Sequence, residues 1–136
     1  MQDFRNLEVW SRAHELTLRV YRLTEGFPRS EMFGLSAQLR RASASIATNL
    51  AEGCGRTQAE FGRFVQISFG SACEVEYQLL LAKDLGFISA ADCENATTDL
   101  IRLKRMLSSL MQRLHGAALV SKNAKSAIVS SLNVMP

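Results

Sequence analysis

Apolar residues recur every three or four positions in long segments of this chain. In the clearest segment the spacings are 4, 3, 4, 3 and 4 residues, through Ala96, Leu100, Leu103, Leu107, Leu110 and Leu114. The same pattern near the N-terminus runs through Val9, Ala13, Leu16, Val20, Leu23 and Phe27. This spacing places the apolar side chains on one face of an α-helix, whereas a strand would show alternation. The chain has only two prolines, Pro28 and Pro136, whose ring prevents a helix from continuing through them.

Capping and turn residues divide the chain into four expected helices, over residues 7–25, 31–53, 58–85 and 90–115. The expected N-caps are Ser30, Thr57 (in a T-x-x-E capping box) and Ser89. Glycine is common just after the last residue of a helix. The expected helix ends therefore lie at Gly26, Gly53, Gly86 and Gly116.

The four segments predict an all-α protein, an up-and-down four-helix bundle formed by residues 1–116. The connecting segments are short, so successive helices should run antiparallel. A chain of 136 residues is the usual size of one domain. Residues 117–136 contain Ser, Ala and Lys with scattered aliphatic residues, and they predict a flexible or disordered tail. A short docked helix within the tail is the alternative.

Composition excludes several classes of protein. No apolar run approaches the roughly 20 residues of a membrane span, and the first six residues lack the apolar core of a signal peptide. Cys54, Cys73 and Cys93 are odd in number and far apart, which favours reduced thiols and a cytoplasmic protein. The net charge is +3, but residues 1–116 hold 14 Lys/Arg against 13 Asp/Glu. Net charge alone is therefore a weak argument for nucleic-acid binding.

Motifs for catalysis or cofactor binding are missing from the sequence. It has no Gly-rich phosphate loop and no H-E-x-x-H or Glu-x-x-His pattern. Its two histidines, His14 and His115, are not at ligand spacing from a cysteine. We therefore expect a protein that is not an enzyme and that needs neither a metal nor another cofactor.

The third expected helix has apolar residues around its whole circumference. A helix that is apolar all round should be buried all round. In a monomeric four-helix bundle, however, each helix normally keeps one face in contact with solvent. The excess indicates a protein–protein interface and a closed homo-oligomer. Cover by the C-terminal tail or by long side chains is the alternative. The interface candidates are Phe61, Phe64, Ile67, Phe69, Tyr77 and Leu81.

The second expected helix carries an ordered polar stripe along one side. It consists of Gln38, Arg41, Ser45, Asn49, Glu52 and Arg56. Its short and amide side chains favour a hydrogen-bonded seam between helices or subunits. A solvated face and a ligand- or RNA-contacting surface are the alternatives. The small residues Ala44, Ala47 and Ala51 lie beside the stripe and would let another backbone approach closely.

Several of these residues also resemble a known family. The segments Leu7-Glu8-Val9-Trp10, Phe33-Gly34-Leu35, Gln38 to Ala42 and Asn49 to Gly53 are similar to the proteins encoded in 23S ribosomal RNA intervening sequences. The resemblance continues through Ser45-Ile46, Phe61, Arg63-Phe64, Gly70-Ser71 and Glu74-x-Glu76, and so covers about residues 4–115. It departs at Cys54, where some members have phenylalanine or tyrosine.

The resemblance implies an antiparallel four-helix bundle that forms ring-like homo-oligomers, often pentamers, and it implies no known activity. A family of similar fold, the accessory proteins of diversity-generating retroelements, binds nucleic acid and a reverse transcriptase. Arginine outnumbers lysine twelve to four in this chain, and its guanidinium pairs well with phosphates or with carboxylates. The candidate nucleic-acid contacts are Arg12, Arg19, Arg22, Arg40 and Arg63.

Two functions remain open at this point. The first is a homo-oligomeric accessory protein that binds RNA or another nucleic acid, with a reverse transcriptase or another protein as a further partner. The second is an assembly or interaction module without nucleic-acid contact. The arginine-rich helices favour the first, and the apolar third helix with the near-neutral charge favours the second.

Overall fold

The computed structural model of the protein describes residues 3–133, and this part of the chain contains four α-helices and no strand. The two short 3₁₀ turns are η1 (Phe4–Asn6) and η2 (Arg29–Glu31). The helices are α1 (Glu8–Thr24), α2 (Leu35–Gly53), α3 (Gln58–Asp84) and α4 (Ala90–Asn133). The all-helical prediction is therefore confirmed for the described residues.

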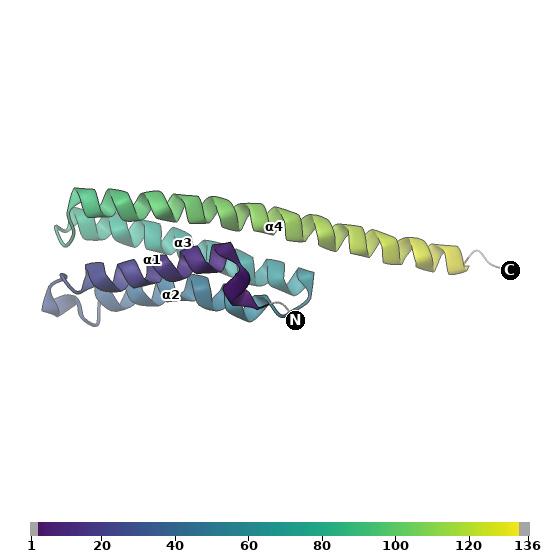
Figure 1. The fold of residues 1–136 in the computed structure, drawn as a ribbon, viewed down its shortest axis with the longest axis horizontal. Helices are drawn as coiled ribbons and strands as arrows, with labels where there is room; N and C mark the ends of the chain where they lie inside the picture. Colours follow the sequence, from purple (N-terminus) through teal and green to yellow (C-terminus); the bar gives the residue numbers. More distant parts are fainter. Residues whose placement is uncertain (1–2, 134–136) are drawn as a thin grey trace.

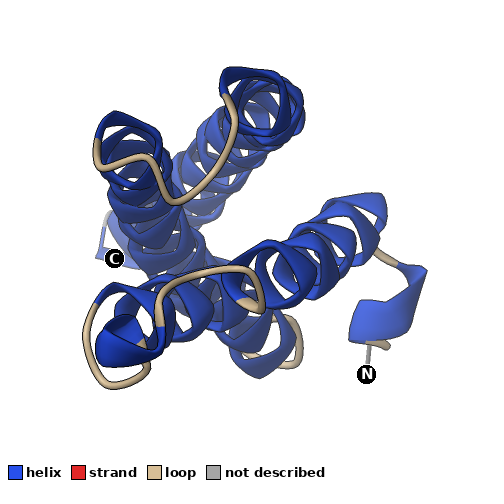
Figure 2. Ribbon diagram, turned by 90° about the vertical axis from the view of Figure 1, so that its left-hand side faces the viewer, coloured by secondary structure: helices blue, strands red, loops and turns tan. Residues whose placement is uncertain are grey.

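The four helices lie alongside one another (Figure 1). The α1–α2 and α3–α4 connections lie at the left-hand end of that view, and the α2–α3 connection lies at the other end. Figure 2 looks onto the left-hand end and shows the helices grouped around a common centre. Helix α1 contacts α2 and α4, and α3 likewise contacts α2 and α4.

The predicted apolar faces form the core between the helices. Leu100, Leu103 and Leu107 of α4 are at most 1% exposed, and Val20 of α1 is fully buried. Burial of each such side chain contributes roughly 1.5–3 kcal/mol. Ser68 is also fully buried, and its hydroxyl donates to the Ile46 carbonyl oxygen at 2.9 Å. The core therefore joins α3 to α2 by a buried polar contact as well as by apolar packing.

Two of the three predicted N-caps are confirmed. The Thr57 hydroxyl accepts a hydrogen bond from the Glu60 amide at 3.3 Å, and the Ser89 hydroxyl accepts one from the Asp92 amide at 3.0 Å. The prediction for Ser30 is wrong, because this residue lies within η2 and α2 begins at Leu35. The Glu31 carboxylate accepts from the Leu35 amide at 2.9 Å, so an acidic side chain four residues earlier caps α2.

The predicted glycine at the end of α3 is confirmed. Gly86 has a φ of +78°, a left-handed conformation that glycine adopts without strain. Its amide donates to the Lys83 carbonyl at 2.9 Å, and the Phe87 amide donates to the Ala82 carbonyl at 2.8 Å. This pair of bonds is the Schellman arrangement, which satisfies carbonyls that the end of a helix leaves open.

Helix α4 differs most from its prediction. It continues past Gly116 to Asn133 instead of ending at residue 115, so residues 117–133 are helical rather than an irregular tail. One glycine inside a helix costs only about 1 kcal/mol relative to alanine, and the described part of α4 contains no proline. Residues 117–133, called the α4 arm below, extend beyond the end of the other three helices (Figure 1).

Candidate interaction surfaces

The middle of the predicted polar stripe lies between α2 and α3. The Ser45 and Ser71 hydroxyl oxygens are 2.9 Å apart and share a hydrogen bond, and the Arg41 guanidinium pairs with the Glu74 carboxylate at 3.0 Å. The Asn49 amide group donates to the Ser45 carbonyl at 2.8 Å. Arg41 and Ser45 therefore form a hydrogen-bonded seam from α2 to α3 within one chain, and Asn49 supports Ser45 from within α2.

The other stripe residues lie outside this seam. Gln38, Glu52 and Arg56 are exposed. The Arg56 guanidinium lies 5.0 Å from the centroid of the Phe64 ring, and its Nε donates to the Glu52 carbonyl at 3.3 Å. The predicted stripe is therefore a seam at its centre and an accessible polar surface at both ends.

The structure places the six interface candidates in three different environments. Phe61 is only 6% exposed and belongs to the core, so its assignment to an external interface is wrong. Phe64, Phe69 and Leu81 are half-buried. Ile67 and Tyr77 are exposed, by 45% and 62% of their surface. A helical wheel alone could not separate these groups, because it does not show which sides of α3 the neighbouring helices cover.

One uncharged stripe of α3 faces outward, and we call it the α3 outer face. Its members are exposed: Gln66, Ile67, Gly70, Cys73, Tyr77 and Leu80. An ion pair lies on each side of it: Arg41–Glu74 toward α2 at 3.0 Å, and Lys104–Glu76 toward α4 at 3.1 Å. An apolar centre with a polar rim is the usual anatomy of a protein interface.

Several arginines predicted to contact nucleic acid have partners within the chain. Arg19 pairs with Asp99 of α4 at 2.6 Å, and Arg12 lies 3.7 Å from Glu8. Arg40 donates from Nε to the Thr24 hydroxyl at 2.7 Å and lies over the Tyr21 ring. Arg19 thus joins α1 to α4 and Arg40 joins α2 to α1, whereas the Arg12 pair lies within α1. Arg22 and Arg63 are exposed.

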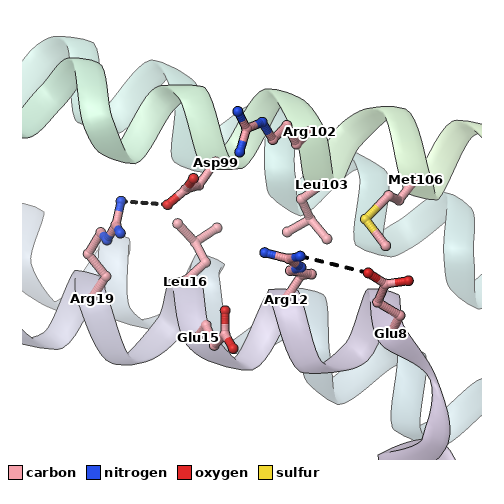
Figure 3. Close-up of a pocket in the computed structure, with 9 residues that line it drawn as sticks. All are labelled: Glu8, Arg12, Glu15, Leu16, Arg19, Asp99, Arg102, Leu103 and Met106. Atoms are coloured by element: carbon pink, nitrogen blue, oxygen red, sulfur yellow. Dashed lines mark ion pairs between the residues drawn. The ribbon is translucent and has the colours of Figure 1, made fainter.

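A pocket of about 150 Å³ lies between α1 and α4 (Figure 3). Its charged side chains alternate in sign along the groove: Glu8, Arg12, Glu15, Arg19, Asp99 and Arg102. Leu16 and Leu103 separate the charges on its apolar wall. Three carboxylates balance three guanidinium groups here, so this pocket does not concentrate positive charge for a phosphate.

A second groove, of about 690 Å³, is bordered by the start of α1, the α2–α3 connection and the middle of α4. Arg56, Arg105 and Arg113 line it, and Glu8 is its one acidic residue. Cys54 also lines the groove and is 6% exposed; burial, and to a smaller extent the Asp3 carboxylate, raises the pKa of its thiol. A buried thiol of raised pKa is a poor nucleophile.

Positive charge gathers on α4 beyond Asp99. Residues 100–136 contain six Lys or Arg side chains and no Asp or Glu: Arg102, Lys104, Arg105, Arg113, Lys122 and Lys125. Arg102, Arg105 and Arg113 are exposed, and their spacing of three and eight residues places them on one side of the helix. We call these three residues the α4 basic stripe. Sequence reasoning missed it because the charge was summed over residues 1–116.

No three His, Cys, Asp or Glu side chains among the described residues are grouped to hold a metal ion. Within the same residues, no helix has the length and apolar character needed to cross a membrane.

Comparison with known proteins identifies the fold. Residues 5–109 match the family described as 23S rRNA-intervening sequence protein. The chain belongs to this family. A crystal structure of a protein of unknown function from the S23 ribosomal protein family of Bacteroides thetaiotaomicron is similar to it, with a TM-score of 0.70 and 25% identity. That likeness covers 76% of this chain and 97% of the other. No curated protein matches the chain.

Proposed function

We propose that this chain is a non-enzymatic, cytoplasmic RNA-binding accessory protein that works as a homo-oligomer. The observation that carries the proposal is the α4 basic stripe. Its three arginines are exposed, and the sequence beyond Asp99 has no acidic residue. Arg105 and Arg113 also lie outside the charge-balanced pocket between α1 and α4, which Arg102 lines. Phosphate contacts by arginine provide most of the affinity of many nucleic-acid-binding proteins, whereas arginines already paired with carboxylates provide less.

The groove beside the stripe extends the same surface. Arg56 lines it from the α2–α3 connection, and Arg105 and Arg113 line it from α4. From Arg102 to Arg113 the helix rises about 16 Å at 1.5 Å per residue, a length that spans several phosphates of one strand. Because the family is described by a ribosomal RNA intervening sequence, RNA is the nucleic acid we propose.

The proposed assembly is a ring of antiparallel four-helix bundles, a pentamer in the form that the family resemblance suggests. A ring places copies of the α4 basic stripe side by side. Several weak phosphate contacts, one set from each copy, then act on the same RNA and raise its overall affinity. A reverse transcriptase or another nucleic-acid enzyme is the protein partner that such an accessory factor would serve.

Replacement of two stripe arginines tests the RNA proposal. We expect Arg105→Ala with Arg113→Ala to weaken binding to a labelled RNA hairpin by at least about tenfold, as measured by fluorescence anisotropy. Arg29→Ala is the matched control, because Arg29 is exposed in η2 and lies outside the stripe. An equal loss in both variants, or an unchanged affinity in the double variant, would contradict the proposal.

The alternative is an assembly module without RNA contact, and the α3 outer face supports it. Tyr77 and Ile67 expose apolar surface between two ion pairs. Exposure of apolar surface to water is unfavourable, so a partner that covers this face would stabilise the protein. Tyr77→Arg would then dissociate the oligomer in light scattering, whereas Arg22→Ala would not. If the intact chain assembles and shows no salt-sensitive RNA binding, this alternative replaces the first proposal.

A further inference from the structure

The α4 arm has an apolar face that the described chain leaves largely uncovered. Ala117, Val120, Ala124 and Ile128 follow one another at spacings of three, four and four residues, and so share one side of the helix. Val120 and Ile128 are 69% and 60% exposed. We propose that this face docks into the groove between α1 and α2 of a second copy of the chain.

The described side chains of the arm are mostly exposed, so packing within one chain does little to stabilise it. It contains several Ser residues, and its described side chains form no ion pair. Most of the stability of a helix in a protein comes from tertiary packing of its apolar face. The arm also lies beyond residues 5–109, the part that matches the family. Its partner is therefore a feature of this chain rather than of the family fold.

The receiving groove is a shallow depression of about 660 Å³ between α1 and α2. Its floor on α2 is made of small residues, Ala44, Ala47 and Ala51, which allow another helix to approach closely. Its wall on α1 carries Trp10, whose ring stacks on the His14 ring at a centroid distance of 5.1 Å and an interplanar angle of 7°.

The Trp10 wall is held in place from both sides. The Phe4 ring of η1 packs edge-on against Trp10 at a centroid distance of 4.9 Å, so the wall is preformed rather than adaptable. A preformed apolar wall beside a floor of small residues suits the apolar face of a helix. The groove and the arm therefore match in chemistry.

Charge favours the same pairing. Glu52 borders the groove and is exposed. Lys125 lies at the edge of the apolar face of the arm, and the arm has no acidic residue. If the arms of two copies paired with each other, their lysines would approach one another. If an arm instead lies in the groove, its lysine approaches the carboxylate of Glu52. The groove is thus the better partner for the arm.

The contact must form between copies. Helix α4 passes straight from the core into the arm and carries it beyond the ends of α1, α2 and α3 (Figure 1). The arm cannot turn back onto the α1–α2 groove without breaking the helix. Each copy then gives an arm and receives one, and such a head-to-tail contact forms a ring when its rotation closes. The inference concerns assembly, and it does not rest on RNA binding.

Mixed crosslinking tests the contact directly. In a Cys73→Ser background, one batch of full-length chain carries Glu52→Cys and another carries Lys125→Cys. We expect the mixture to give a disulfide-linked dimer of the two chains after mild oxidation. The control replaces Lys125→Cys by Ser126→Cys, one residue along the arm but on its opposite side. Equal crosslinking of the two arm positions would overturn the proposal.

A charged residue on the docking face gives an independent test. This test does not depend on how the arm is aligned along the groove. Ile128→Asp should raise the protein concentration at which the oligomer dissociates by at least about tenfold, because a carboxylate would be buried in the apolar groove. Ser126→Asp, on the exposed side, should leave it unchanged. Light scattering without RNA measures both. If Ile128→Asp leaves the molecular mass of the oligomer unchanged, the proposal is overturned, whether or not RNA binding becomes weaker.

Discussion

The Lys104 ammonium of α4 lies 3.1 Å from the Glu76 carboxylate of α3 and 5.5 Å from the centroid of the Phe69 ring. This pair joins the two helices at one edge of the α3 outer face. The hydrogen bond from Lys104 to Glu76 favours the charged ammonium and raises the pKa of Lys104 above its usual value of 10.5.

The raised pKa of Lys104 predicts a loss of stability at high pH. The pKa of Lys104 is higher in the folded chain than its usual value of 10.5 in the unfolded chain. The resulting stabilisation is therefore complete below pH 10.5 and is lost as the pH rises through the pKa of the folded chain. Lys104→Met should therefore lower the free energy of unfolding at pH 8, and the difference from the native chain should shrink above pH 10.5. Urea unfolding at a series of pH values measures this. A difference that stays constant across the series would contradict the assignment.

The close approach of α2 to α3 at Gly53 predicts opposite effects for two Gly→Ala substitutions. A Cβ on Gly53 would lie 2.6 Å from the Phe64 Cβ and 3.0 Å from a Phe61 ring atom. Because Phe64 Cβ is fixed to the backbone of α3, the helices would have to separate, at a cost of about 1–3 kcal/mol. A Cβ on Gly62 would make only an ordinary contact of 3.8 Å with Leu114.

Gly62→Ala should instead stabilise the chain by about 0.5–1 kcal/mol, the usual gain for alanine in a helix. Chemical denaturation of both variants measures the difference from the native chain. A stabilising Gly53→Ala would show that the two helices are not in contact at this point.

The three cysteines should differ in reactivity toward a thiol reagent. Cys73 is exposed on the α3 outer face, whereas Cys54 and Cys93 are buried. At pH 8 we expect one fast thiol per dissociated chain and two slow ones, because burial hinders access and the raised pKa of Cys54 lowers its thiolate fraction. Cys73→Ser should remove the fast phase.

The same measurement reports on the α3 outer face. If this face is buried between copies, the Cys73 reaction should slow as the protein concentration is raised through the range of assembly, while Cys54 and Cys93 stay slow. A Cys73 rate that does not change when the chain assembles would show that the α3 outer face remains in contact with solvent.

Much of the fold could be predicted because short-range patterns determine it. The leucine spacing on α4 identified buried positions such as Leu100 and Leu107, and the side chains of Thr57 and Ser89 capped the helices that they were predicted to cap. Helix ends that depend on weaker signals were less predictable. Gly116 does not end α4, because one glycine without a following proline costs too little to stop a helix.

The surfaces were harder to predict because they depend on which helices are neighbours. Phe61 and Tyr77 look alike in a sequence, yet one is in the core and the other is 62% exposed. Arg19 and Arg105 are equally basic, but only the fold brings Asp99 to Arg19. The absence of acidic residues after Asp99 is visible in the sequence and would have pointed to α4.

The salt dependence of RNA binding tests the central proposal most directly. The logarithm of the association constant of the native chain for an RNA hairpin should fall linearly with the logarithm of salt concentration, because phosphate contacts release counterions. With Arg105→Ala and Arg113→Ala together, the slope should become shallower by about 1.5, since each phosphate contact contributes about 0.7–0.9. Binding that is absent, or insensitive to salt, would contradict the account.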